Sequence, residues 1–193
     1  SELTSIDIPA SVTSIGEYAF YGCSSLAAVT LPDGLQSIGE DAFRGCRALT
    51  SIDIPASVTS IGAGAFDGCS RLAAVTLHDG LESIGSYAFN GCTSLTAIRI
   101  PGTVKTVEDN SFYGCSALAS LELAEGVQEL GSLAFQNCSA LTQVTLPASL
   151  TKVGIWAFAG HGASIVFTSL ATTPPSSISF PLGEEDGVTL YVP

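Results

Sequence analysis

Basic residues and histidines are scarce in this sequence. Six lysines and arginines stand against eighteen aspartates and glutamates among 193 residues, which gives a formal net charge of −12. Because proteins bind nucleic acids through basic surfaces that neutralise phosphates, this shortage predicts that the chain binds neither DNA nor RNA. The two histidines, His78 and His161, form no spaced set with a serine and an aspartate, and no glycine-rich phosphate loop occurs. These absences argue against an enzyme and against a bound cofactor.

A long apolar run is also missing. Hydrophobic residues make up 46% of the chain, but no stretch approaches the ~20 consecutive apolar residues that a membrane-spanning helix needs. Apolar residues that are spread at intervals predict a packed core in a protein that is not embedded in a membrane. The sequence has no methionine, shows no signal peptide and begins inside a repeating pattern. We therefore expect a mature or excised part of a longer protein.

A repeat of about 23 residues runs through the chain and determines the expected fold. Each unit starts with a leucine, and these are Leu3, Leu26, Leu49, Leu72, Leu95, Leu118 and Leu141. Apolar residues follow three and five positions later, as Ile6 and Ile8 do in the first unit, and this alternation is typical of a β-strand. A proline such as Pro9 usually ends the segment, because proline donates no hydrogen bond to a strand ladder. A single unit cannot bury its apolar face, whereas stacked units can.

The rest of each unit predicts the other elements of an α/β solenoid. Stacked strands form one parallel sheet, and residues 12–16 alternate weakly, as a second short extended run would. Residues 17–22 have the composition of a single helical turn that ends at Gly22. Acidic residues at the start of such turns, as at Glu40 and Asp41, suit a helix N-terminus.

Cysteine occurs at the same position in six units. The six residues are Cys23, Cys46, Cys69, Cys92, Cys115 and Cys138. Even spacing is compatible with disulfides or a zinc site. In a stacked solenoid, however, neighbouring Cβ atoms lie as far apart as the turns, about 4.8 Å, which exceeds the ~3.8 Å usual for a disulfide. Zinc needs ligands that converge from different directions, so we favour a ladder of buried thiols that serve as small core residues.

The repeat resembles a known bacterial family. The pattern L-x-x-[IV]-x-[IL]-P, followed by I-G-x-x-A-F-x-G-C, resembles the BspA-like (bacterial surface protein A) leucine-rich repeat, and residues 171–175 and 189–193 are similar to the segment that closes many such arrays. The resemblance implies a right-handed leucine-rich-repeat solenoid with a concave parallel β-sheet and short helical turns on the convex side. It also implies a secreted or cell-surface protein whose relatives adhere to host matrix proteins, host cells and other bacteria.

The repeats divide the chain into two regions. Residues 1–161 are expected to form the leucine-rich repeat array, with six complete copies and a degenerate seventh in which His161 stands at the cysteine position. Residues 162–193 are expected to form an irregular C-terminal capping segment with a strand at 188–192. Without an N-terminal cap, the first repeat would expose an apolar edge, which favours end-to-end packing of an otherwise monomeric chain.

Outward positions of the strands and of the loops that follow them supply the candidate binding face. Its seven members are Asp7, Asp53, Arg99 and Glu122 in the strand column, and Asp33, Asp79 and Glu125 in the loop column. Residues 3–48 match residues 49–94 at 35 of 46 positions, which indicates a duplicated pair of repeats. Acids on alternate turns would lie about 10 Å apart, near the screening length of physiological salt, so the spacing either limits repulsion or reflects duplication alone.

These observations predict a non-enzymatic adhesion module for a host matrix protein, a cell-surface protein or a glycan, and its acidity favours a basic partner. A patch that departs from the repeat consensus would mark the binding face, and Arg99 with its neighbours fits this best. Outward positions that are interchangeable between copies would instead fit a rigid spacer within a larger surface protein. Aromatic residues on the predicted helical side are a second candidate, because such residues anchor interfaces. They are Tyr18, Tyr21, Tyr87, Tyr113 and Trp156.

Overall fold

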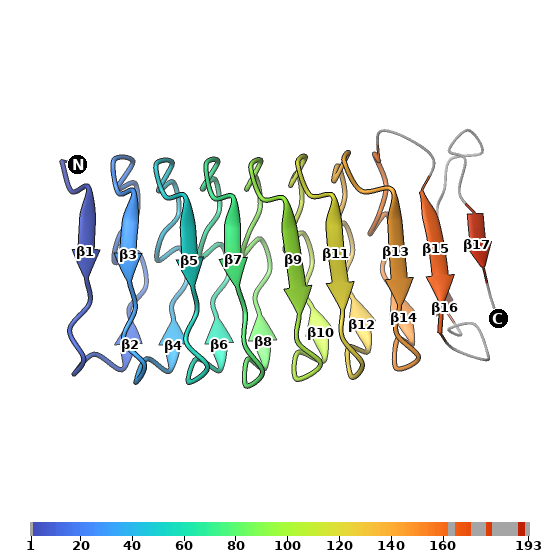
Figure 1. Ribbon diagram of the computed structural model, residues 1–193, viewed down its shortest axis with the longest axis horizontal. Coiled ribbons are helices and arrows are strands. Elements are labelled where there is room, and N and C mark those ends of the chain that lie inside the picture. The colour runs from blue at the N-terminus through green and yellow to red at the C-terminus, as the bar shows by residue number, and fades with distance from the viewer. Residues whose placement is uncertain (1, 162–164, 171–176, 179–188, 192–193) are drawn as a thin grey trace.

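Two sets of parallel strands run along the molecule, and each repeat is one turn of a stacked coil (Figure 1). The structure is a computed structural model that describes residues 2–161, 165–170, 177–178 and 189–191. The turns follow one another in chain order along the long axis, from β1 at the N-terminal end to β17 near the C-terminal end (Figure 1). The predicted parallel solenoid, with one repeat in each turn, is therefore confirmed.

The first set consists of strands of three or four residues. They are β1 (Ser5–Asp7), β3 (Ala28–Thr30), β5 (Ser51–Asp53), β7 (Ala74–Thr76), β9 (Ala97–Ile100), β11 (Ser120–Leu123), β13 (Gln143–Leu146), β15 (Val166–Ser169) and β17 (Thr189–Tyr191). Paired residues occupy equivalent positions of consecutive repeats, as Ser5 and Ala28 do. β1 and β3 form a two-stranded sheet beside the seven-stranded sheet of β5 to β17. The outward side of these strands and of the loops that follow them is termed the strand face.

The second set consists of two-residue strands and confirms the second extended run. They are β2 (Ser14–Ile15), β4 (Ser37–Ile38), β6 (Ser60–Ile61), β8 (Ser83–Ile84), β10 (Thr106–Val107), β12 (Glu129–Leu130), β14 (Lys152–Val153) and β16 (Ser177–Ile178). All eight belong to one parallel sheet. The coil thus has a hydrogen-bonded ladder on two sides, which fixes the spacing of the turns.

Inward-facing side chains of both sets make a continuous apolar core. In the third turn, Leu49, Ile52 and Ile54 are 0%, 4% and 0% exposed. Because successive repeats place apolar residues at the same positions, each turn covers the apolar edge of its neighbour. In the first turn, Ile6 and Ile8 are only half-buried.

The segments between the second strand and the next repeat are turns, so the prediction of short helices is wrong. No helix occurs within the described part of the chain. The N–H groups of Phe20 and Gly22 donate to the carbonyl oxygens of Ala42 and Arg44 in the next turn, at 2.7 and 2.8 Å. An α-helix needs these N–H groups for bonds within its own segment, so bonding between turns excludes it. The side of the molecule formed by residues 17–22 and their counterparts is termed the turn side.

Each turn segment contains two residues in the left-handed backbone region. The second is usually a glycine, such as Gly22 with a φ of 67°. The first carries larger residues, including Tyr18, Tyr87 and Trp156 with φ angles of 56°, 60° and 56°. A non-glycine residue pays about 1–2 kcal/mol for this conformation, and the hydrogen bonds between turns hold the backbone there. The same geometry recurs in every turn because the ladder imposes it.

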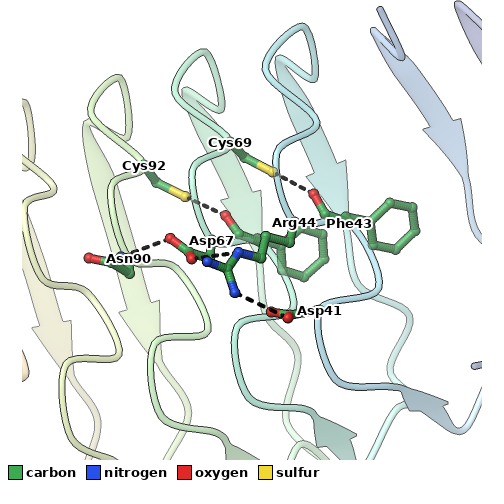
Figure 2. A network of polar contacts seen from close by, with 8 residues as sticks. Asp41, Phe43, Arg44, Asp67, Cys69, Asn90 and Cys92 are labelled. Carbon is green, nitrogen blue, oxygen red and sulfur yellow. Dashed lines mark hydrogen bonds and ion pairs between the residues drawn. The ribbon is translucent and has the colours of Figure 1, made fainter. Parts of the chain in front are cut away.

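Two ladders of side chains lie beneath the turn side. Phenylalanine rings of consecutive turns stack from Phe20 to Phe158, with centroids 5.0–5.5 Å apart and planes within 9° of parallel. The cysteines from Cys46 to Cys138 are buried, and each thiol donates to the carbonyl oxygen of the phenylalanine one repeat earlier. Figure 2 shows two of these bonds. The predicted ladder of buried thiols is confirmed, although Cys23 in the first turn is half-buried.

The strand ladders continue beyond residue 161. β15 pairs with β13, β17 pairs with β15, and β16 extends the second sheet from β14. The strand predicted near the C-terminus is present as β17. Most of the other residues predicted to form the cap lie outside the described residues.

Candidate binding surfaces

The strand face carries all seven charged residues that were predicted to form a binding face. Side chains alternate along a β-strand, so the residue after a buried strand position points outward. All seven residues are exposed: Asp7, Asp33, Asp53, Asp79, Arg99, Glu122 and Glu125. The repeat therefore brings residues from six turns onto one side of the molecule.

Arg99 on β9 joins two of these acids. Its Nη1 donates to Asp79 Oδ1 and its Nε donates to Glu122 Oε1, both at 3.1 Å. The Arg99, Asp79 and Glu122 side chains remain 43%, 71% and 64% exposed. The hydrogen bond to Asp79 is the main cause that raises the pKa of Arg99. Such exposed ion pairs add no more than about 1 kcal/mol to stability, so these groups remain available to a partner.

The other acids of the strand face lie apart from this group. His78 Nε2 is hydrogen-bonded to Asp53 Oδ1 at 2.8 Å, and the Asp53 side chain is still 73% exposed. Glu125 Oε2 accepts a hydrogen bond from the backbone N–H of Ala148 at 3.1 Å. The structure thus brings together Asp79, Arg99 and Glu122, and it spreads the remaining four residues along the strand face.

A second charged group, which the sequence analysis missed, lies on the turn side (Figure 2). Arg44 Nη1 is 3.2 Å from Asp41 Oδ2, and Arg44 Nε is 3.1 Å from Asp67 Oδ2. Asn90 Nδ2 donates to Asp67 Oδ1 at 2.8 Å. Arg44, Asp67 and Asn90 therefore form a polar row across three consecutive turns, as Figure 2 shows. Asp41 pairs with a guanidinium here and caps no helix, contrary to the prediction.

The two acids that pair with Arg44 are shielded from solvent. The Asp41 and Asp67 side chains are 10% and 18% exposed, whereas Arg44 is 46% exposed. The hydrogen bond to Asp41 is the main cause that raises the pKa of Arg44. The Arg44 guanidinium also lies 5.9 Å from the centre of the Tyr21 ring, within the range of a cation–π contact.

The row borders a shallow depression of about 380 Å³. Its lining comes from the same three positions of the second, third and fourth turns: Glu40, Asp41 and Arg44, then Ala63, Gly64 and Asp67, then Ser86, Tyr87 and Asn90. Arg44 and Asp67 also line a second depression of about 400 Å³, which Tyr21 borders. The turn side therefore offers a recessed polar surface.

A feature of the sequence could have pointed to this site. The two duplicated units differ at eleven positions, and six of these differences fall at the three positions that line the first depression. The differing pairs are Glu17/Ala63, Tyr18/Gly64, Tyr21/Asp67, Glu40/Ser86, Asp41/Tyr87 and Arg44/Asn90. The acids of the strand face are unchanged in the same comparison, as Asp7/Asp53 and Asp33/Asp79. In these four turns, the turn side therefore departs further from the repeat consensus than the acids of the strand face do.

Aromatic residues are exposed on the turn side, with one exception to the prediction. Four are about half exposed: Tyr18, Tyr21, Tyr87 and Trp156, at 53%, 54%, 49% and 50%. Tyr113 is half-buried instead. Among the four, Tyr21 and Tyr87 border the two depressions.

The buried thiols from Cys46 to Cys138 favour the protonated form, because burial raises the pKa of each. Burial is the main cause that raises the pKa of Cys46 and of Cys138 to about 12, and a protonated thiol is neither a nucleophile nor a metal ligand. Within the described ranges, no group of three or more histidine, cysteine, aspartate or glutamate residues could hold a metal ion. In the part of the chain that the structure describes, no helix is long and apolar enough to cross a bilayer.

Comparison with known proteins gives one family and several solved structures. The family model described as a BspA type leucine rich repeat region, with six copies, matches residues 1–115 and 64–173. A leucine-rich repeat protein from Bacteroides ovatus is 28% identical over 88% of this chain and 56% of its own, with a TM-score of 0.67. One from Eubacterium ventriosum is 29% identical over 91% and 45%, with a TM-score of 0.77.

A third solved structure is described as a leucine rich cell surface protein from Faecalibacterium prausnitzii. It is 29% identical over 88% of this chain and 55% of its own, with a TM-score of 0.51. The chain thus spans about half the length of each of these three proteins. A search of curated proteins finds no match.

Proposed function

Since the chain belongs to the BspA type leucine-rich repeat family, we propose that it is a non-enzymatic binding module that presents its strand face to a basic region of a protein outside the bacterial cell. Proteins of this fold are repeat scaffolds that act through the side chains on their surfaces. The F. prausnitzii protein that resembles the chain is described as a cell surface protein, which supports the location.

The observation that carries the proposal is the charge of the strand face. Six of the seven predicted residues on it are exposed carboxylates, and Arg99 of the fifth turn pairs with one of them, Asp79 of the fourth. The other acids of the first four turns are Asp7, Asp33 and Asp53. A surface with one sign of charge raises the association rate of an oppositely charged partner and repels a like-charged one. Arg99 with Asp79 and Glu122 adds a place where the charge changes sign, which can set the register of a partner.

A rigid spacer within a larger surface protein is the second candidate. Stacked phenylalanine rings with centroids 5.0–5.5 Å apart, the continuous eight-stranded ladder and the seven-stranded ladder make a stiff rod. The unchanged strand-face acids of the duplicated units also favour it. A spacer needs no partner on the strand face, and this separates the two candidates experimentally.

The test compares two charge-reversed variants of equal net charge. The first carries Asp53→Lys, Glu122→Lys and Glu125→Lys on the strand face. The matched control carries Glu2→Lys, Glu17→Lys and Glu108→Lys, all at exposed acids outside it. Surface plasmon resonance against a panel of purified basic and acidic extracellular-matrix proteins is the measurement.

We expect saturable binding to basic members of the panel that weakens as salt increases, and a loss of at least about tenfold in affinity only in the strand-face variant. Equal losses in the two variants would mean that the overall charge decides binding. No saturable binding to any panel member, with both variants folded by circular dichroism, would favour the spacer.

A further inference from the structure

We propose that the turn side carries a second binding site, for a neutral saccharide, in the depression between the second and fourth turns. This site is separate from the strand face, and the proposal does not depend on the function proposed above. It rests on the shape of the depression, on the aromatic residue at its border, and on the mixed charge of its polar lining.

The shape follows from the size of the side chains in three consecutive turns. The third turn has Ala63 and Gly64 where the second has Glu40 and Asp41, so the surface dips between larger neighbours. Gly64 has a φ of 61°, and a Cβ atom there would clash with the Asp41 carboxylate, so the floor must stay small. The volume of about 380 Å³ lies at the lower end of the ~300–1,000 Å³ typical of small-molecule sites.

Tyr87 supplies the aromatic border. It lines the depression and is 49% exposed, and a φ of 60° holds its backbone in the left-handed region. The face of an aromatic ring carries partial negative charge. The C–H groups on one face of a pyranose ring carry partial positive charge, so a sugar stacks on a tyrosine while its hydroxyl groups remain at the rim.

The polar groups of the row can bind those hydroxyl groups. Within the described part of the chain, Arg44 uses Nε and Nη1 for its ion pairs, and Asn90 uses Nδ2 for its bond to Asp67. Arg44 Nη2 and Asn90 Oδ1 therefore provide a donor and an acceptor beside the depression. Both groups are held in place by their bonds to Asp67, which lowers the entropy lost when a ligand binds.

The charge of the lining selects against ions. An anion would meet Glu40 and the carboxylates of Asp41 and Asp67, with only Arg44 in its favour. A cation, such as a lysine side chain, would meet the Arg44 guanidinium, which already occupies the space between the two shielded carboxylates. A neutral polyhydroxyl ligand avoids both penalties and can use donors and acceptors together.

The second depression suggests that the ligand extends beyond one sugar. It shares Arg44 and Asp67 with the first, and it is bordered by a second exposed aromatic residue, Tyr21. The turns repeat at about the separation of the stacked rings, 5.0–5.5 Å, which is close to the length of one hexopyranose unit. A short oligosaccharide could therefore place one residue in each depression.

The sequence differences between the duplicated units support a specific role for the first depression. The positions that line the first depression account for six of the eleven differences between residues 3–48 and residues 49–94. Core positions and strand-face acids stayed the same in these two units. The surface that changed after duplication is thus the one that contains the depression.

The test is a titration of the whole chain with defined oligosaccharides, monitored by NMR of the side chains and by calorimetry. The probes are cellotetraose, mannotetraose, chitotetraose and lacto-N-tetraose, with sialyllactose as the acidic and tetralysine as the basic comparison. The variants are Tyr87→Asn, since Asn110 occupies the same position in the next turn, and Ala63→Ile, since Ile155 occupies that position in the seventh. Trp156→Asn is the matched control, because Trp156 has the same backbone conformation and a similar exposure in the seventh turn, outside both depressions.

We expect at least one neutral tetrasaccharide to bind with a dissociation constant of about 1 mM or lower. Tyr87→Asn should weaken this binding about tenfold, as loss of an aromatic contact does. Ala63→Ile should weaken it by filling the floor, whereas Trp156→Asn and the strand-face charge-reversed variant should leave it unchanged.

Three results would overturn the proposal. One is the absence of binding by every neutral probe at about 10 mM, a concentration well above the expected dissociation constant. Another is saccharide binding that is equally strong in Tyr87→Asn and Ala63→Ile. The third is tighter binding of sialyllactose or tetralysine than of any neutral probe at this site.

Discussion

On the strand face, the acids that pair with Arg99 are 71% and 64% exposed, whereas on the turn side the acids that pair with Arg44 are only 10% and 18% exposed. Both arginines bridge acids from different repeats, at 3.1–3.2 Å. The difference comes from position within the repeat. Strand-face side chains project from a ladder, while turn-side side chains lie over the tight turns that pack on the phenylalanine stack.

This contrast indicates that the two sides use charge for different purposes. Exposed pairs contribute little to folding, so the strand face can vary its charges to suit a partner. Shielded and hydrogen-bonded groups are costly to remove, so the charged groups of the turn side also have a structural role. The predictions below separate these roles, from the largest expected effect to the smallest.

The largest effect is expected at Gly62, just before the turn side, where the backbones of neighbouring repeats lie close together. A Cβ atom at Gly62 would lie 2.6 Å from the backbone nitrogen of Glu40, whereas one at Gly16 would meet nothing within 4 Å. We predict that Gly62→Ala lowers the free energy of unfolding by about 3 kcal/mol through overpacking. Gly16→Ala should change it by less than about 1 kcal/mol. Urea denaturation checks both, and equal losses would contradict the stacking geometry.

The buried thiols predict a loss of stability at high pH. The folded-state pKa of Cys138 is raised to about 12 by burial, above the ~8.5 of an unfolded thiol. Its contribution is therefore fully present below about pH 8.5 and is lost as the pH rises towards 12. Each pH unit in that window costs up to about 1.4 kcal/mol for this thiol.

Denaturation curves at pH 7, 9 and 10.5 measure this loss. The variant Cys138→Ala should show a shallower decline between pH 9 and 10.5 than the natural chain. An identical slope for the two proteins would mean that the thiol does not remain protonated in the folded state.

A smaller effect is expected from the polar row. Asp67 pairs with Arg44 and accepts a hydrogen bond from Asn90. We predict that Asp67→Ala lowers the free energy of unfolding by about 1–2 kcal/mol, because it leaves two partly buried partners without their acceptor. Thermal denaturation is the measurement, and a change below about 0.3 kcal/mol would contradict a structural role for the row.

The sequence predicts which residues are buried, but it does not predict which backbone groups bond to a neighbouring turn. Leu49, Ile52 and Phe66 each belong to a set of apolar residues that recurs at the same position of every repeat. This recurrence was sufficient to predict stacked turns and a continuous core, because the residues that recur are the ones that become buried. The helical turns were wrongly predicted because composition gives local preference only. The N–H of Phe20 bonds to the next turn, at Ala42, and no local pattern contains that partner.

Of the two candidate surfaces, the sequence predicted the strand face but not the polar row of the turn side. Alternation along the strands placed Asp53, Arg99 and Glu122 on the strand face correctly. The row of Arg44 and Asp67 was missed because its members come from different repeats and differ in residue type between them. Only a comparison of equivalent positions in consecutive turns brings such residues together.

The smallest effect on stability is expected on the strand face. Asp79 is 71% exposed and contacts Arg99 alone among the pairs described above. We predict that Asp79→Ala changes the free energy of unfolding by less than about 0.5 kcal/mol, while it weakens the binding of a basic partner. A loss of more than about 1 kcal/mol in urea denaturation would mean that strand-face pairs also hold the fold.

The most direct test of the account is to map where a basic extracellular protein contacts the chain. Backbone amide signals of the labelled chain would be followed by NMR during titration with a basic protein from the matrix panel. The account predicts saturable shifts centred on Asp79, Arg99 and Glu122, which fade as salt increases, with Arg44 and Asp67 unaffected. Shifts centred on the turn side, or the absence of saturable shifts with every basic protein of the panel, would contradict the claim that the strand face is the protein-binding surface.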